Sequence, residues 1–197
     1  MFALKPFQEN TIAKLKDQFL TLWKSPHDNI PLVFKSPTGS GKTIMMAQFL
    51  RDLVGDPRFY GNDVAFIWLT FNEESYVQSK NKLFSYYGGA SELDLLDLND
   101  LTQGKLNKNS VFFINWQKIK GTSKESRKLR KDNEWGLTFD NFIEKTKEDG
   151  RKLVVIVDEE HIGADTQLAD EIFNLISPII TIRVSATPKY VPNAEEM

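Results

Sequence analysis

Cysteine is absent from this chain of 197 residues, and histidine occurs only twice. Without cysteine the chain can form neither disulfide bonds nor thiolate metal sites, which fits a reducing compartment. An excess of charge of one sign is missing too, since 25 lysines and arginines stand against 27 aspartates and glutamates. This balance excludes a globally basic surface that would attract nucleic acid, although it permits a local basic track.

Long apolar segments are also missing. The N-terminal stretch MFALKPFQENTIAKL lacks the apolar core of a signal peptide, and no apolar run approaches the length of a membrane span. Internal repeats and low-complexity tracts are not visible either. The sequence therefore predicts a soluble, cytoplasmic protein, and its length predicts one domain with a substantial core.

Short apolar runs alternate with helix-like segments along the chain. Helices are expected at residues 8–24, 43–54, 73–86, 138–149 and 167–175, and strands at 31–34, 63–70, 111–116, 152–161 and 179–188. These strands are apolar throughout instead of alternating, a pattern typical of a parallel sheet with helices on both faces. The predicted fold class is α/β with one open parallel sheet, whose ligands would bind at the carboxyl ends of the strands.

The segment SPTGSGKT (36–43) lies between an expected strand and an expected helix. Backbone N–H groups of such a glycine-rich loop, together with the helix N-terminus, form a cradle for phosphate. Gly39 and Gly41 would let the backbone curl around the anion, Lys42 would reach the β- and γ-phosphates, and Thr43 would ligate Mg²⁺. The alternative is an ordinary glycine-rich turn. The nucleotide-binding residues predicted from this segment are Pro37, Thr38, Gly39, Ser40, Gly41, Lys42 and Thr43, with ATP and Mg²⁺ as cofactors.

Serine occupies position 36, where this phosphate-binding pattern usually begins with glycine. A small residue should still fit there, so the departure is mild.

The segment VVIVDEEH (154–161) ends a buried strand with carboxylates. On the same sheet edge as the phosphate loop, Asp158 could hold the Mg²⁺ shell, and Glu159 could polarise the water that attacks the γ-phosphate. Adjacent carboxylates at a buried strand end are costly unless a cation or hydrogen bonds compensate them. The alternative is a solvated acidic loop. With Lys42, these two acidic residues are the predicted catalytic set, and Asp158 and Thr43 are the predicted metal ligands.

A third motif, RVSATPK (183–189), offers two hydroxyls near the same edge. In this order, SPTGSGKT, DEEH and SAT resemble motifs I, II and III of superfamily 2 helicases and translocases, including the DEAD/DEAH-like ATPases. The resemblance implies a P-loop NTPase fold, the first of two RecA-like lobes. It also implies that Ser185 and Thr187 couple the nucleotide state to the grip on nucleic acid, with His161 in the same relay. For His161 the alternative is a polar residue that simply follows a strand.

Three further stretches narrow the resemblance. FQENTIAKL (7–15), INWQKI (114–119) and LADEIFNLISPIITIRVSATPK (168–189) are similar to the Res subunit of type III restriction enzymes. By this resemblance, Gln8 would bind the adenine edge; alternatively it is a solvated glutamine at a helix start. DNA and a modification (methyltransferase) subunit are the partners that the resemblance implies.

The same family touches the DNA backbone with loops that follow its strands. The residues at these positions are Thr70, Phe71, Asn72, Asn115, Trp116 and Gln117. Such side chains and amides could bind phosphates without reading bases, although Trp116 could equally belong to the core. The basic segment 118–131 could be a phosphate track or a solvated loop.

The expected function is that of an ATP-hydrolysing motor lobe of a DNA helicase or translocase, in a defence enzyme of the type III restriction kind. Residues 1–197 would be the first lobe, poorly active alone, and the second lobe and any nuclease would lie outside this chain. The alternative is a stand-alone ATP-binding sensor module that does not translocate. An ABC-type ATPase is disfavoured because no LSGGQ-like segment is present.

Overall fold

The strands form one parallel sheet. The computed structural model describes residues 3–25, 29–71, 73–88, 91–120, 138–158, 167–186 and 195–196. Within these ranges the strand order is β3-β4-β2-β5-β6-β1-β7, and every neighbouring pair is parallel. The strands are β1 (Ile30–Lys35), β2 (Val64–Thr70), β3 (Asp94–Leu96), β4 (Ser110–Asn115), β5 (Lys152–Asp158), β6 (Ile180–Ser185) and β7 (Glu195–Glu196).

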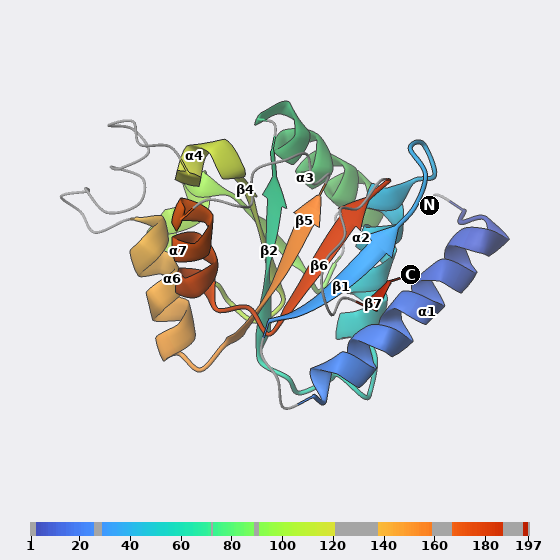
Figure 1. Cartoon of the computed structure of the whole chain (residues 1–197), viewed down its shortest axis with the longest axis horizontal. Coiled ribbons are helices and arrows are strands. Elements are labelled where there is room, and N and C mark those ends of the chain that lie inside the picture. Colours follow the sequence, from blue (N-terminus) through green and yellow to red (C-terminus); the bar gives the residue numbers. More distant parts are fainter. Residues whose placement is uncertain are drawn as a thin grey trace.

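Helices cover both faces of this sheet, as Figure 1 shows. On one face lie α1 (Pro6–Trp23), α2 (Lys42–Val54) and α3 (Glu73–Tyr87), and on the other α4 (Trp116–Lys120), α6 (Phe139–Glu148) and α7 (Gln167–Ile176). A 3₁₀ helix, η1 (Leu98–Gln103), follows β3. The predicted α/β architecture with helices on both faces is confirmed.

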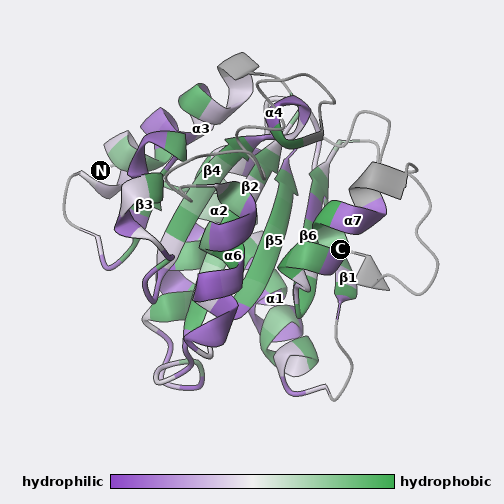
Figure 2. Ribbon diagram, turned by 90° about the vertical axis from the view of Figure 1, so that its left-hand side faces the viewer, coloured by the Kyte–Doolittle hydropathy of each residue, from purple (hydrophilic) through white to green (hydrophobic). Residues whose placement is uncertain are grey.

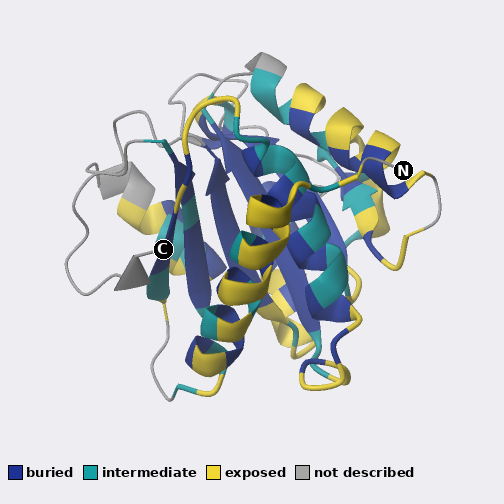
Figure 3. Cartoon of the chain, turned by 90° about the vertical axis from the view of Figure 1, so that its right-hand side faces the viewer, coloured by how far each residue is buried: buried dark blue, intermediate teal, exposed yellow. Residues whose placement is uncertain are grey.

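The strands are buried on both faces because their side chains are apolar at successive positions. In β2 all seven residues are buried, with Phe66 and Trp68 in the core under α1–α3 and Ile67 and Leu69 in the core under α4, α6 and α7. The strands are accordingly hydrophobic in Figure 2 and buried in Figure 3, behind helices whose outer faces are exposed. Two cores on either side of one sheet follow directly from these non-alternating runs.

Several boundaries differ from the sequence expectation. The strand expected at 111–116 ends at Asn115, because Trp116 already begins α4, and the strand expected at 179–188 is β6, which ends at Ser185. The short elements β3, η1, α4 and β7 were not predicted, since two to six residues carry too little periodicity to be recognised. Among the described residues, no helix is long and apolar enough to cross a membrane.

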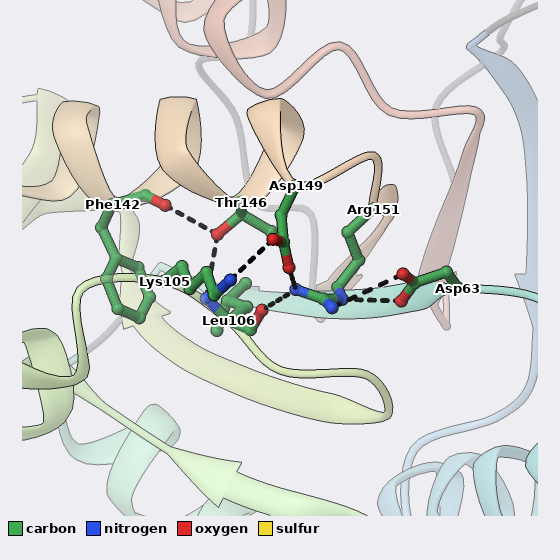
Figure 4. A network of polar contacts seen from close by, with 7 residues as sticks. All are labelled: Asp63, Lys105, Leu106, Phe142, Thr146, Asp149 and Arg151. Atoms are coloured by element: carbon green, nitrogen blue, oxygen red, sulfur yellow. Dashed lines mark hydrogen bonds and ion pairs between the residues drawn. The ribbon is translucent and has the colours of Figure 1, made fainter.

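A polar network ties together the amino ends of β2 and β5 (Figure 4). The Arg151 side chain is only 9% exposed; its Nε donates to Asp63 Oδ1 at 2.7 Å, and its Nη1 lies 2.9 Å from Asp149 Oδ2. Arg151 also donates to the backbone carbonyl of Leu106. The hydrogen bond from Lys105 to Asp149 holds the pKa of that carboxyl below its usual value. One guanidinium thus joins three segments at the edge opposite to the phosphate loop.

Replacing Arg151 should destabilise the fold without touching the nucleotide site. Arg151→Met leaves a backbone carbonyl and a carboxylate without their donor, which should cost about 1–3 kcal/mol of unfolding free energy. Lys105→Met is the matched control, because its ion pair with Asp149 is exposed to solvent and should contribute much less to the unfolding free energy. Urea denaturation measures both, and equal losses would contradict the central place of Arg151 in the network.

Candidate nucleotide-binding site

The register of the parallel strands gathers the candidate residues at one edge of the sheet. Thr70 of β2 pairs with Asp158 of β5, Asp158 pairs with Val184 of β6, and Val184 pairs with Phe34 of β1. The loop that follows β1 therefore starts at the same level as the carboxylate that ends β5, and Figure 1 shows this loop at the edge to which the arrowheads point.

The loop between β1 and α2 has the shape of a phosphate cradle. Gly39 and Gly41 adopt positive φ angles of 78° and 88°, which favour glycine, and Gly41 caps α2. The first amides of α2 have no partner within the helix, so they can serve an anion. Lys42 is buried, with Nζ 3.5 Å from the Pro37 carbonyl oxygen, and Thr43 is half-buried beside it. Because this hydrogen bond is long, the Lys42 ammonium can exchange the carbonyl for phosphate oxygens.

Serine at position 36 has specific partners inside the loop. Its hydroxyl lies 2.7 Å from the Ser40 hydroxyl, and its amide donates to the Ser185 carbonyl at 3.1 Å. Both Ser36 and Ser185 are buried. The residue that departs from the usual glycine thus ties the phosphate loop to the end of β6, where the predicted coupling residue Ser185 lies.

Gln8 also holds the phosphate loop. Its Nε2 donates to the Ser40 carbonyl at 2.8 Å, and its Oε1 accepts from the Lys5 amide at 2.8 Å. Gln8 is only 9% exposed, so it is not a solvated residue at a helix start. A side-chain amide offers two N–H groups and two lone pairs, of which these bonds use one each. Adenine binding by Gln8 stays a prediction, and the structure adds a loop contact that the sequence did not reveal.

The predicted acidic residues are described only in part. Asp158 is 8% exposed and accepts hydrogen bonds from Trp68 Nε1 at 3.2 Å and from the Ser79 hydroxyl at 3.3 Å. These two donors could not be recognised from the sequence, because a tryptophan in an apolar strand and a serine in a helix are common. The other predicted catalytic and coupling residues, Glu159, His161 and Thr187, lie outside the described residues.

Two of the predicted DNA-contact positions end strands, and a third begins a helix. Thr70 and Asn115 end β2 and β4 and are buried. Trp116 is 2% exposed, and its ring lies 6.1 Å from that of Phe71 and 5.9 Å from that of Phe173. In the described part of the chain, Asn115 Nδ2 and Trp116 Nε1 are buried donors without a hydrogen-bond partner. Trp116 therefore belongs to the core, which is one of the two alternatives that the sequence analysis left open.

The remaining DNA-contact positions are more accessible or lie outside the description. Gln117 is exposed on α4, and the Lys118 ammonium lies 5.5 Å from the centre of the Tyr76 ring. Asn72 lies outside the described residues, and so do residues 121–131 of the basic segment.

Comparison with known proteins identifies the family. The family described as "Type III restriction enzyme, res subunit" matches residues 1–190. The chain belongs to this family. It is therefore an ATPase motor domain of the helicase type, from a family that uses ATP and Mg²⁺. No curated protein matches the chain.

A solved structure shares the fold of this Res-family chain. A nuclease-deletion mutant of the Type ISP restriction-modification enzyme LlaGI, in complex with a DNA substrate mimic, matches 96% of this chain with a TM-score of 0.56 and 14% identity. The chain spans 18% of the length of that protein. The HK97 bacteriophage large terminase matches 93% of this chain and 33% of its own, with a TM-score of 0.48 and 16% identity.

Two glycine substitutions should separate the strain of the loop from its contact with Gln8. Alanine at either position forces a non-glycine residue into the left-handed region, at about 1–2 kcal/mol. At Gly41 the new Cβ would also lie 2.7 Å from Gln8 Nε2, whereas at Gly39 it meets nothing within 4 Å. Gly41→Ala should therefore lower the free energy of unfolding by about 0.5–1.5 kcal/mol more than Gly39→Ala does, because it displaces the hydrogen bond from Gln8 to the Ser40 carbonyl.

The background variant Gln8→Ala tests this cause. In that background the two glycine variants should have the same melting temperature, measured by differential scanning calorimetry. A difference that persists without the Gln8 side chain would show that the clash is elsewhere.

Proposed function

We propose that this chain is the ATP-hydrolysing first lobe of a DNA translocase in a defence enzyme of the type III restriction kind. The observation that supports it best is the common edge of the phosphate loop and Asp158, because a magnesium ligand is useful only beside the phosphates. The Ser36–Ser185 hydrogen bond supports the further proposal that the nucleotide state is passed to motif III.

The residues at this edge suit MgATP. When bound, MgATP would supply the γ-phosphoryl group that is transferred to water. Lys42 would neutralise charge on the phosphates, while the Thr43 hydroxyl and the Asp158 carboxylate would hold the cation. Glu159 would orient the attacking water and accept its proton, and Gln8 would bind the adenine.

DNA is the proposed substrate of the motor. Gln117 is exposed where β4 meets α4, the end of the sheet that also carries Thr70 and Phe71. Together with Phe71 and Asn72, Gln117 would contact phosphates without reading bases, whereas Asn115 and Trp116 are buried beneath this surface. A methyltransferase subunit is the proposed partner, by analogy with restriction systems of this family.

Coupling would run through the motif III strand. Ser185 and Thr187, with His161, would sense whether the γ-phosphate is present and alter the grip on DNA. Brisk hydrolysis would require a second lobe, since the P-loop and Asp158 form only one wall of the site. An arginine from that lobe would stabilise the transferring group, a contribution of about 10³ to 10⁵ in rate in related phosphoryl-transfer enzymes.

Lys42→Ala should abolish MgATP binding and leave the fold intact. The lysine supplies positive charge to the phosphates, and within the described part of the chain it makes one long hydrogen bond, to the Pro37 carbonyl. Lys35→Ala is the matched control, because it removes the same charge from an exposed position at the start of the loop. The thermal shift on adding ATP should vanish in Lys42→Ala and persist in Lys35→Ala. A shift that survives the loss of Lys42 would refute the nucleotide site.

Glu159→Gln should stop hydrolysis in the protein that contains both lobes while leaving ATP binding near normal. Loss of a general base typically lowers the rate by about 10² to 10⁴. The adjacent Glu160→Gln removes the same charge and should retain most of the activity. Steady-state ATP hydrolysis with and without duplex DNA is the measurement, and DNA should stimulate the wild type. Hydrolysis indifferent to DNA would favour a nucleotide sensor over a motor.

A further inference from the structure

Two neutral donors converge on one oxygen of Asp158. Trp68 Nε1 donates to Asp158 Oδ2 at 3.2 Å, and the Ser79 hydroxyl donates to the same oxygen at 3.3 Å. Trp68 is fully buried and Ser79 is 5% exposed. Water therefore cannot easily replace either donor, and each bond has more influence on the carboxylate than it would have at the surface.

The sheet itself aims the indole at the carboxylate. Thr70 pairs with Asp158, and Trp68 precedes Thr70 by one strand period, so Trp68 lies on the same face of the sheet as Asp158. On the neighbouring strand Phe113 pairs with Trp68 and stacks on its ring, with centroids 5.4 Å apart and planes at 26°. The ring is thus held on one side by β4 and presents its N–H to the end of β5.

Ser79 approaches from the helix layer. It lies on the core-facing side of α3, one helical turn before Leu83, which is fully buried. A hydroxyl on such an apolar stripe needs a hydrogen-bond partner, and Asp158 Oδ2 provides it. A strand and a helix therefore fix the same carboxylate oxygen from two directions.

We propose that Trp68 and Ser79 are positioning residues that orient Asp158 for Mg²⁺ in the nucleotide site. The inference rests on the proposed function, in which Asp158 is a ligand of that cation. Groups that hydrogen-bond a ligating side chain fix its orientation, and their loss typically weakens metal affinity by about 10- to 100-fold. Neither residue belongs to the predicted set of nucleotide-binding residues.

The test measures the Mg²⁺ dependence of ATP binding by the whole chain. A fluorescent ATP analogue is titrated at a series of MgCl₂ concentrations and also in EDTA. Trp68→Phe, which keeps an aromatic ring for Phe113, and Ser79→Ala should each raise the half-maximal MgCl₂ concentration by roughly 10-fold. Affinity for the analogue in EDTA should not change, because the phosphate loop is intact.

Two control variants make the same substitutions away from Asp158. Trp23→Phe alters an indole whose ring centroid lies 4.8 Å from that of Phe59, and Ser110→Ala removes a buried hydroxyl that has no hydrogen-bond partner among the described residues. Both should leave the MgCl₂ dependence at the wild-type value even if they change the melting temperature. A purely structural role for Trp68 and Ser79 would move the melting temperature alone.

The variant Asp158→Asn distinguishes a failure of the positioning role from a failure of the proposed function. If Asp158→Asn changes the MgCl₂ dependence while Trp68→Phe and Ser79→Ala do not, the positioning role is overturned and the proposed function stands. If Asp158→Asn has no effect, both are overturned. If Trp68→Phe does not fold, the MgCl₂ titration of Ser79→Ala decides whether the proposal holds.

A spectroscopic measurement supports the titration. The chain has 4 tryptophans, so ¹⁵N-tryptophan labelling gives few indole resonances. The Trp68 resonance, identified by its loss in Trp68→Phe, should shift when MgCl₂ is added to the ATP-bound chain. It should not shift in Asp158→Asn, and an unchanged resonance in the wild type would count against the proposal.

Discussion

Parallel pairing in a fixed register is the constraint on which the rest of this structure depends. It places Phe34, Val184, Asp158 and Thr70 in one row across four strands, although they are far apart in the sequence. Both faces of these strands are buried under helices, so a slip of one residue would move each side chain to the wrong core. Burial of apolar side chains thereby fixes the level at which the phosphate loop leaves β1 and at which the carboxylate ends β5.

Hydrogen bonds from other parts of the protein hold the phosphate loop in its shape. Gln8 fixes the Ser40 carbonyl from α1, and Ser36 bonds both Ser40 and the carbonyl of Ser185. A preorganised loop loses less conformational freedom on binding, which favours affinity. The same contacts join the loop to α1 and to β6, so a movement of the loop would strain its hydrogen bonds to both elements.

The amino ends and the carboxyl ends of the strands carry different kinds of polar contact. At the amino ends, the network around Arg151 joins segments and contributes to stability (Figure 4). At the carboxyl ends, β2 and α3 both donate to Asp158, and these two elements flank the segment at Phe71 that is proposed to meet DNA. A displacement of that segment would therefore reach the carboxylate through Trp68 and Ser79 directly.

The sequence by itself determined the α/β class and the order of the main elements, and it predicted the phosphate loop, because apolar periodicity and a glycine-rich turn are local properties. It also indicated Asp158, since a carboxylate that ends an apolar run is visible in a few residues. Only the tertiary structure decided that Gln8 holds the loop and that Trp116 is buried among aromatic rings. The short elements β3 and α4 and the donors to Asp158 were likewise decided there. The physical reason is that each of these depends on hydrogen bonds or packing between residues far apart in the chain, and such partners meet only when the strands pair and the helices cover them.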